Sequence, residues 1–395
     1  MKVAFLTSGG IAPCLTSSIA ALIKIYYNKS QDISFLGYKY GYKGLLLGDS
    51  IILPVYIENI ESFNEFGGTL LGNSRVKLTN INDCINKGYI KENQLPLEVA
   101  AKQLIKDRVD VLHTIGGDDT NSTASDLVNY LKDYNYDLTV VGIPKTIDND
   151  VFPIKQTLGA WTAAEQSARF FSNIVNENTT SSRHLIIHEI MGRNCGWLAA
   201  ESARIYLNSI DSKLFFDKFN ISKESWSIDA IYIPEIPIDI EIESERLLEL
   251  MDKKDSVNIF LSEGAGIESI VKDKEINGEQ VKRDAFGHPR LDDINPGLWF
   301  AKHFKDKLKA DKVLVQKSGY FARSSKPNKL DSKLIMDTAI KAVECSLSGK
   351  SGVVGLDQES GGILSCIDFN RIKGGKKFDY NLVWYKDILD MIGQK

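Results

Sequence analysis

Two glycines, two carboxylates and a hydroxyl follow one another at Gly116–Thr120. The apolar run Val109–Ile115 precedes them and predicts a buried strand, and Ser122–Val128 predicts the start of a helix. In an open parallel sheet, ligands bind at the carboxyl ends of the strands. The adjacent carboxylates Asp118 and Asp119 repel each other unless a hard cation such as Mg²⁺ binds there with the help of substrate phosphates. The alternative is a strand-to-helix turn with an Asp N-cap.

A second cluster of charged side chains, Pro144–Asp150, follows the apolar segment Leu138–Ile143, which predicts another strand. The cluster contains a lysine, a threonine and two carboxylates: Lys145, Thr146, Asp148 and Asp150. Together these groups can bind a phosphoryl group and accept a proton. An Asp-rich turn is the alternative, but it does not explain the lysine so close to the strand end.

Two glycine-rich segments are further candidates for phosphate binding. Ser8–Gly10 lies between a predicted strand, Lys2–Thr7, and a predicted helix, Thr16–Tyr27. Free backbone N–H groups and a helix N-terminus there can accept a phosphate, although a tight turn explains the same residues. Gly67–Arg75 combines glycines, hydroxyls and an arginine, which suits an anion-binding loop. A solvent-exposed loop whose arginine faces water is the alternative.

The second half of the chain repeats the pattern of an apolar strand followed by a polar turn. Arg193 follows the predicted strand Leu185–Ile190 and is a candidate ligand of a sugar phosphate. His188, within that strand, is interpreted as a strand residue rather than a catalyst. Glu263 follows the predicted strand 258–262. It either accepts hydrogen bonds from sugar hydroxyls or is an acid at a helix N-terminus.

Apolar strands alternate with helices along most of the chain. This order predicts a parallel sheet covered by helices on both faces. Gly37–Gly48 is expected to be a glycine-rich loop, and the polar stretch Ile267–Asp293 an insertion or a surface region.

Composition excludes several classes of protein. With 395 residues, of which 43% are hydrophobic, the chain can form two or three domains with large cores. The net charge of -4 gives no basic surface, so nucleic-acid binding is not expected. Five dispersed cysteines without a CxxC pair argue against a disulfide framework or a zinc site. No apolar run approaches the roughly 20 residues of a membrane span. A cytoplasmic protein without a membrane partner is expected.

Taken together, the turns resemble those of the phosphofructokinase family, in the family's order across most of the chain. The matching segments are Thr7–Gly10, Gly68–Arg75, Gly116–Thr120, Pro144–Asp150, Met191–Arg193, Ser262–Gly264 and Gly319–Arg323. Two longer strings, His188–Trp197 and Val315–Arg323, look like the pyrophosphate-dependent members. The resemblance implies an α/β fold of two Rossmann-like three-layer αβα domains, with the active site in the cleft between them.

The resemblance also implies an approximate domain division. Residues 1–158 with 322–375 would form the domain for the phosphoryl donor and Mg²⁺. Residues 159–321 with 376–395 would form the sugar-phosphate domain.

The resemblance implies roles for matching positions. Gly10 would contact the phosphoryl donor, and Asp118 would bind Mg²⁺ bridging the pyrophosphate. Asp148 would be the general base on the sugar hydroxyl, with Thr146 and Ile147 lining the same turn. Six residues would hold fructose 6-phosphate: Met191, Gly192, Arg193, Glu263, Tyr320 and Arg323. Two more would be phosphate ligands: Arg75 and Lys317.

The chain departs from the ATP-using members at Ile11, Asp119 and Lys145, where those enzymes have an Asp and two glycines. The Asp119 side chain would fill the space of a nucleotide's α-phosphate and repel it. Lys145 would supply positive charge for pyrophosphate. Asp119, Lys145 and Asp148 are therefore the expected catalytic group.

The expected reaction is reversible phosphoryl transfer from pyrophosphate to fructose 6-phosphate, carried out by a homodimer. Sedoheptulose 7-phosphate is a possible second acceptor. One alternative is an ATP-dependent 6-phosphofructokinase. The other is a non-catalytic sugar-phosphate-binding regulatory subunit, against which the intact Asp118 and Asp148 argue.

Overall fold

The structure is a computed structural model that describes residues 1–54, 57–216, 218–219, 221–282, 294–372 and 374–394. These residues form two compact units. The first unit contains residues 1–163 and 323–376, and the second contains residues 164–322 and 377–395. Neither unit is continuous in sequence, because each is completed by a segment from the C-terminal part of the chain.

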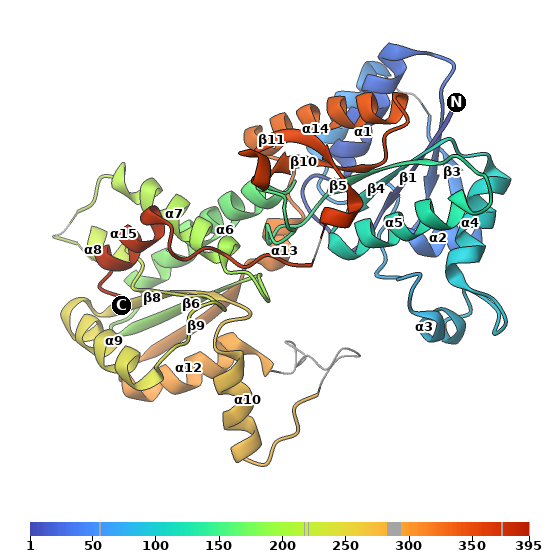
Figure 1. Ribbon diagram of the computed structural model, residues 1–395. Helices are drawn as coiled ribbons and strands as arrows, with labels where there is room; N and C mark the ends of the chain where they lie inside the picture. The colour runs from blue at the N-terminus through green and yellow to red at the C-terminus, as the bar shows by residue number, and fades with distance from the viewer. Residues whose placement is uncertain (55–56, 217, 220, 283–293, 373, 395) are drawn as a thin grey trace. The chain divides into compact units, whose positions relative to one another are not determined.

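Within the described residues, the first unit contains a seven-stranded sheet of order β11-β10-β5-β4-β1-β2-β3 (Figure 1). Its strands are β1 (Lys2–Thr7), β2 (Ser34–Tyr38), β3 (Ser50–Ile52), β4 (Val111–Gly116), β5 (Thr139–Pro144), β10 (Gly352–Asp357) and β11 (Ile363–Ile367). The five inner strands pair in parallel, as predicted. Both edge strands, β3 and β11, pair antiparallel, which the sequence prediction missed. The five-residue connection 358–362 before β11 reverses the chain and is too short for a parallel crossover.

Helices cover both faces of this sheet. They are α1 (Leu15–Lys29), α2 (Tyr42–Leu47), α4 (Pro96–Asp107), α5 (Asp118–Lys132) and α14 (Lys329–Leu347). The short helix α3 (Ile81–Asn86) also belongs to this unit. α1 packs with α14 on one face, and α4 packs with α2 and α5 on the other (Figure 1). All six residues of β4 are buried as a result. This explains why the inner strands are apolar throughout rather than alternating.

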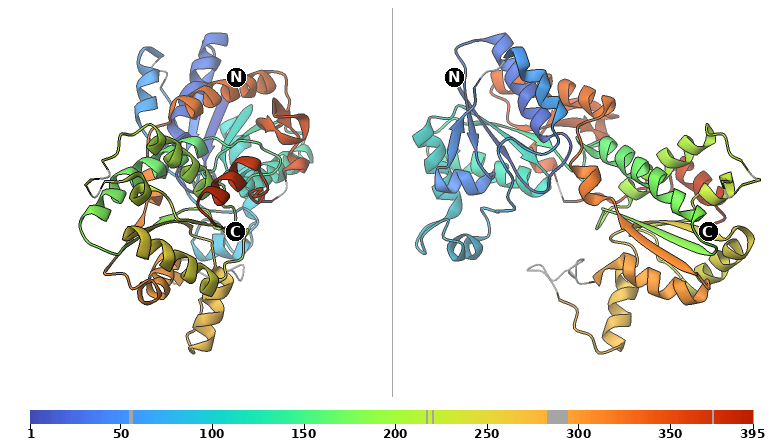
Figure 2. Two further views of the ribbon diagram at one scale, coloured as in Figure 1. Left: turned by 90° about the vertical axis from the view of Figure 1, so that its left-hand side faces the viewer. Right: turned by 180° about the vertical axis from the view of Figure 1, so that it is seen from behind.

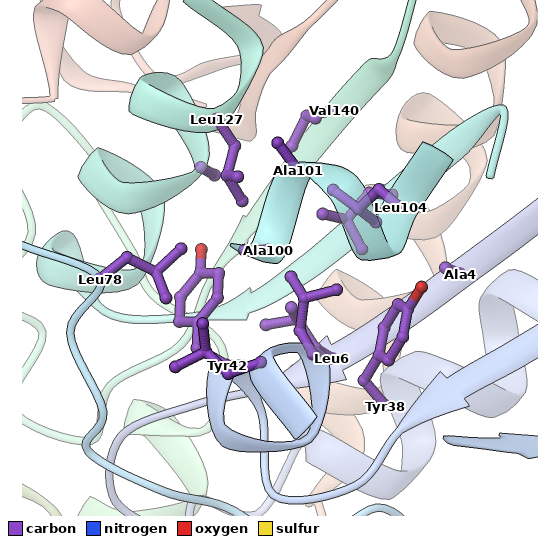
Figure 3. Close-up of a cluster of buried hydrophobic side chains, with 14 of the residues drawn as sticks. Ala4, Leu6, Tyr38, Tyr42, Leu78, Ala100, Ala101, Leu104, Leu127 and Val140 are labelled. Atoms are coloured by element: carbon purple, nitrogen blue, oxygen red, sulfur yellow. The ribbon is translucent and has the colours of Figure 1, made fainter. Parts of the chain in front are cut away.

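The segment Gly37–Gly48 contains helix α2, so the prediction of a loop there is wrong. Tyr42 and Leu45 are buried in the core cluster of the first unit, which also contains Leu6 (Figure 3). The Tyr42 hydroxyl donates a hydrogen bond of 2.8 Å to the carbonyl oxygen of Thr120. Burial of this face stabilises a helix that glycine-rich composition disfavours.

The second unit has a four-stranded sheet, all parallel, of order β7-β8-β6-β9 in the part of the chain that is described. Its strands are β6 (His184–Ile190), β7 (Ala230–Tyr232), β8 (Ser256–Ser262) and β9 (Lys312–Lys317). Its helices are α7 (Trp197–Asp211), α8 (Lys223–Trp226), α9 (Ile240–Lys254), α10 (Ile267–Ile276), α12 (Pro296–Lys307) and α15 (Val383–Met391). Two further helices, α6 (Ala160–Ile174) and α13 (Gly319–Arg323), include a unit boundary. α7 packs on one face of the sheet and α9 and α12 on the other, as Figure 1 and the right-hand view of Figure 2 show.

Two further predictions need correction. α5 begins at Asp118 rather than at Ser122, because Gly117 is its N-cap. Gly319–Arg323 is a short helix rather than a turn. The stretch Ile267–Asp293, expected to be an insertion or a surface region, begins with α10, in which Ile270 is the single buried residue, and its residues 283–293 lie outside the described part of the chain.

Candidate active site

In the first unit, three polar turns lie at the carboxyl ends of the neighbouring strands β1, β4 and β5. The register pairs Thr7 with Ile115 and Gly116 with Pro144, so the strands end at the same level. The turns that follow them therefore lie side by side at one edge of the sheet. This topology gathers three of the predicted site segments: Ser8–Gly10, Gly116–Thr120 and Pro144–Asp150.

Lys145 connects two of these turns. Its side chain is buried, and its Nζ donates a hydrogen bond of 2.6 Å to the carbonyl oxygen of Gly10. A Cβ on Gly9, whose φ is +84°, would lie 3.2 Å from this Nζ, so the missing side chain makes room for the ammonium. Burial lowers the pKa of Lys145 to about 8, although the nearby Cys14 and Asp148 oppose that shift. The site therefore contains a desolvated cation that is close to titrating near neutral pH.

The loop that contains Gly67–Arg75 is fixed against β1. The Thr7 hydroxyl lies 2.9 Å from the Thr69 hydroxyl and donates a 2.9 Å hydrogen bond to the carbonyl oxygen of Gly72. The Gly9 N–H donates to the carbonyl oxygen of Ser74 at 2.9 Å. Arg75 follows this anchored stretch and is exposed. The loop is thus held by the same turn that contains Gly10, and Arg75 is accessible to an anion.

The acidic pair lies in the first turn of α5. Gly117 is the N-cap and makes no side-chain cap, so the interpretation of an Asp N-cap is wrong for this turn. Asp118 Oδ1 accepts a 2.8 Å hydrogen bond from the backbone N–H of Asp119. The Asp119 carboxylate is exposed and forms an ion pair of 2.8 Å with Lys77. The positive end of the helix dipole favours both carboxylates.

Two hydrogen bonds from Thr157 hold the turn after β5 in place. The Thr157 hydroxyl donates to the carbonyl oxygen of Thr146 at 2.8 Å, and its backbone N–H donates to Asn149 Oδ1 at 3.0 Å. Asn149 is buried with φ +54°, a left-handed conformation that Asn tolerates. The backbone N–H of Asp148 donates to Thr146 Oγ1 at 3.1 Å, and Asp148 is half-buried beside the buried Ile147. The loop is therefore pre-organised.

Asp150 belongs to the charged turn Pro144–Asp150, but the sequence analysis gave it no role of its own. Burial raises the pKa of its carboxyl, and the neighbouring charge of Asp118 raises it further. The two acids therefore lie in one electrostatic environment, although they follow different strands. The signal for Asp150 was its place two residues after Asp148 in the same charged turn.

In the second unit, the predicted sugar-phosphate residues also follow neighbouring strands, β8, β6 and β9. The backbone N–H of Gly192 donates to Glu263 Oε1 at 3.3 Å, and the Ser262 hydroxyl donates to the carbonyl oxygen of Gly192 at 2.5 Å. A Cβ on Gly264 would lie 1.8 Å from the carbonyl oxygen of Arg193, so the two turns approach closely. Burial raises the pKa of Glu263, and the N–H of Gly192 opposes this shift.

Lys317, at the end of β9, is held by two side chains that the sequence analysis did not predict as partners. Its Nζ lies 2.8 Å from Glu189 Oε1 and donates to Asn295 Oδ1 at 3.0 Å. Glu189 is buried, and its Oε2 accepts a 2.9 Å hydrogen bond from the N–H of Gly297. No sequence signal linked Asn295 to this cluster, because 22 residues separate it from Lys317.

α13 contains the remaining two predicted residues, Tyr320 and Arg323. Tyr320 is 77% exposed and so can reach a ligand. A Cβ on Gly319 would lie 2.9 Å from Met191 Cγ, which places the start of α13 against the loop after β6. The structure thus brings together Met191, Gly192, Glu263 and the start of α13.

His188 is confirmed as a strand residue within β6. It is fully buried, and its ring stacks on Phe171 at 5.6 Å between centroids and on Phe170 at 5.5 Å. Burial lowers its pKa to about 3, and neither ring nitrogen has a hydrogen-bond partner among the described residues. A neutral imidazole enclosed in this way does not act as an acid or base on a substrate.

The predicted donor residues lie in the first unit, and all the predicted sugar-phosphate residues except Arg323 lie in the second. Within each unit they gather at the carboxyl edge of the sheet. That the two groups meet in a cleft stays a prediction, as do the individual roles of the residues.

Comparison with known proteins gives full-length matches. The model of a family described as phosphofructokinase matches residues 2–346. The chain is 54% identical to a pyrophosphate–fructose 6-phosphate 1-phosphotransferase of Propionibacterium freudenreichii subsp. shermanii, over 100% of this chain and 98% of the relative. It is 52% identical to a protein of the same name from Methylomonas methanica, over 100% of this chain and 96% of the relative.

A solved structure shows the same fold. It is a crystal structure of a pyrophosphate-dependent phosphofructokinase from Marinobacter aquaeolei, with a TM-score of 0.72 and 19% identity. The match covers 100% of this chain and 92% of the other. The predicted two-domain α/β fold is confirmed by this likeness.

Proposed function

The chain belongs to the phosphofructokinase family, and on that basis we propose that it transfers a phosphoryl group from pyrophosphate to the 1-hydroxyl of fructose 6-phosphate. The products are fructose 1,6-bisphosphate and phosphate, and the transfer is reversible. The observation that carries the proposal is the identity of 49–54% to four relatives that bear the name of this activity and match along essentially their whole length.

The proposed chemistry relies on positioning and on charge stabilisation, as phosphoryl transfer generally does. Asp148, on the pre-organised turn after β5, takes the proton of the attacking 1-hydroxyl. Lys145 presents its ammonium to the pyrophosphate and offsets charge on the leaving phosphate. Gly10 lets the donor approach the backbone, and Arg75 binds an outer phosphate oxygen.

The first unit also suits Mg²⁺, which we propose as the metal cofactor. Asp118 would hold it, with Asp150 beside it. Burial raises the pKa of the Asp150 carboxyl, and the neighbouring charge of Asp118 raises it further, so a cation beside these two carboxylates would be stabilised. The described residues contain no group of three or more His, Cys, Asp or Glu side chains that could hold a metal. That suits Mg²⁺, which usually takes one or two carboxylates together with substrate phosphates. When bound, Mg²⁺ supplies positive charge to the phosphate oxygens.

On the sugar side, we propose that Arg193 and Arg323 grip the 6-phosphate as bidentate forks. Glu263 accepts hydrogen bonds from the sugar hydroxyls while the N–H of Gly192 orients its carboxylate. Met191 and Tyr320 line the pocket. Lys317, oriented by Glu189, adds positive charge.

We propose a homodimer in the cytoplasm, acting in glycolysis and its reversal. None of the helices in the described residues is long and apolar enough to cross a membrane.

A coupled assay of the purified protein tests the function. Fructose 6-phosphate is supplied with pyrophosphate or with ATP, each with Mg²⁺ or with a chelator. We expect turnover with pyrophosphate and Mg²⁺, and a kcat/KM for ATP lower by about two decades or more, since a combined steric and electrostatic penalty of roughly 3 kcal/mol at Asp119 suffices. Asp119→Gly should raise the use of ATP. Equal use of ATP and pyrophosphate by the unmodified protein would contradict the proposal.

A further inference from the structure

The ion pair between Lys77 and Asp119 joins two loops of the first unit. Lys77 Nζ lies 2.8 Å from Asp119 Oδ2. Asp119 is in the first turn of α5, directly after Asp118, and Lys77 follows the predicted phosphate ligand Arg75 by two residues. Neither the spacing nor the composition of the sequence pointed to this contact.

The pair contributes little to the stability of the fold. The Lys77 side chain is 32% exposed and that of Asp119 is 63% exposed. Exposed ion pairs of this kind stabilise proteins by roughly 0–1 kcal/mol. The backbone of Lys77, in contrast, is firmly anchored. It lies between the buried Val76 and Leu78, and its carbonyl oxygen accepts a 3.1 Å hydrogen bond from the N–H of Asn80. The ammonium that pairs with Asp119 is therefore attached to a firmly held backbone segment.

Asp119 places a second negative charge beside Asp118, at the proposed site of the phosphoryl donor. Pyrophosphate carries several negative charges, so Asp119 repels the wanted donor as well as a nucleotide. Two unit charges about 8 Å apart interact by roughly 2 kcal/mol at an effective dielectric constant of about 20. Without compensation, the residue expected to exclude ATP would weaken the binding of pyrophosphate by an order of magnitude or more.

We propose that Lys77 is a positioning residue that determines donor specificity through Asp119. Its ammonium offsets the negative charge of Asp119 and holds the carboxylate to one side, so that pyrophosphate is admitted while the carboxylate still obstructs a nucleotide. The inference rests on the proposed function, because it takes pyrophosphate as the donor. It differs from a direct role of Lys77 as a pyrophosphate ligand, in which Asp119 plays no part.

Three variants separate these two roles: Lys77→Met, Asp119→Asn and the double variant. Lys77→Met keeps the aliphatic stem and should raise KM for pyrophosphate by about tenfold or more, with KM for fructose 6-phosphate unchanged. In the double variant no uncompensated charge remains, so KM for pyrophosphate should return to within about threefold of the unmodified value. The preference for pyrophosphate over ATP should fall at the same time.

Lys87→Met is the matched control. Lys87 forms an exposed pair of 2.9 Å with Asp83 on α3, outside the proposed site, so its removal should leave both KM values unchanged. A double variant as impaired as Lys77→Met would show that Lys77 binds pyrophosphate directly and would overturn the inference. A Lys77→Met variant with unchanged KM would overturn it as well. Failure of the proposed function can be told apart from failure of the role proposed for Lys77, because in the first case the unmodified protein itself would show no turnover with pyrophosphate.

Discussion

The charge state of Lys145 should control pyrophosphate use as the pH rises. Its pKa is lowered from 10.5 to about 8, chiefly by burial. The ammonium is therefore mostly charged below pH 8 and loses its proton above it. If only the charged form binds the donor productively, kcat/KM for pyrophosphate should fall as the pH rises through 8. This parameter reports the ionisation of the enzyme before the donor binds.

The size of the effect follows from two quantities. Between about pH 7 and about pH 10, the charged fraction of a group with a pKa of about 8 falls by about two decades. A unit charge about 4 Å from a phosphate oxygen contributes up to roughly 4 kcal/mol at an effective dielectric constant of about 20. Lys145→Met should therefore lower kcat/KM at neutral pH by up to roughly three decades.

The assay measures kcat/KM for pyrophosphate at saturating fructose 6-phosphate, for the unmodified protein and for Lys145→Met, across this pH range. The ratio of the two values cancels the ionisation of pyrophosphate itself, since both proteins receive the same substrate. We expect the ratio to fall with a midpoint near pH 8. Lys145→Arg, which stays charged throughout, should show no such fall. A ratio that is constant with pH would refute the assignment of the titrating cation.

Three further predictions concern other residues. Asp148→Asn should lower kcat by roughly 10²–10⁴-fold, with little change in either KM, because a general base is lost; near-full turnover would remove Asp148 from that role. Arg323→Ala should raise KM for fructose 6-phosphate and leave KM for pyrophosphate nearly unchanged, and the reverse pattern would place Arg323 at the donor. Burial lowers the pKa of His188 to about 3, below its unfolded value of 6.5, so its contribution to stability is complete above that value and is lost as the pH falls toward 3. The free energy of unfolding, measured with urea, should fall between about pH 6.5 and about pH 5 by about 2 kcal/mol more in the unmodified protein than in His188→Leu. An equal fall in both proteins would count against His188 as the origin of this acid dependence.

Much of the fold was predictable because its signals are local. The apolar strands β1, β4, β5, β6 and β8 are buried on both faces, so each is a continuous apolar run in the sequence. The turns that follow them contain glycines and charged residues. Parallel sheets bind their ligands at these turns, at the carboxyl ends of the strands. The family could be identified because these turns occur in the family's order across most of the chain.

Helix α2 and the antiparallel edges were not predictable in this way. Tyr42 and Leu45 form a helix because their faces are buried against a core whose residues come from distant segments. The edge strand β11 pairs antiparallel because a short connection leaves no room for a crossover. Both outcomes depend on neighbours that no local pattern specifies.

The sequence by itself determined which residue types stand at the strand ends, and thus the class of chemistry. Only the tertiary structure decided their partners. It placed Lys145 against the carbonyl oxygen of Gly10, 135 residues away, and Asp119 against Lys77. It buried Glu189 between Lys317 and Gly297. The physical reason is that charge, desolvation and orientation are set by contacts across loops, and these contacts form only when the strands pair in register.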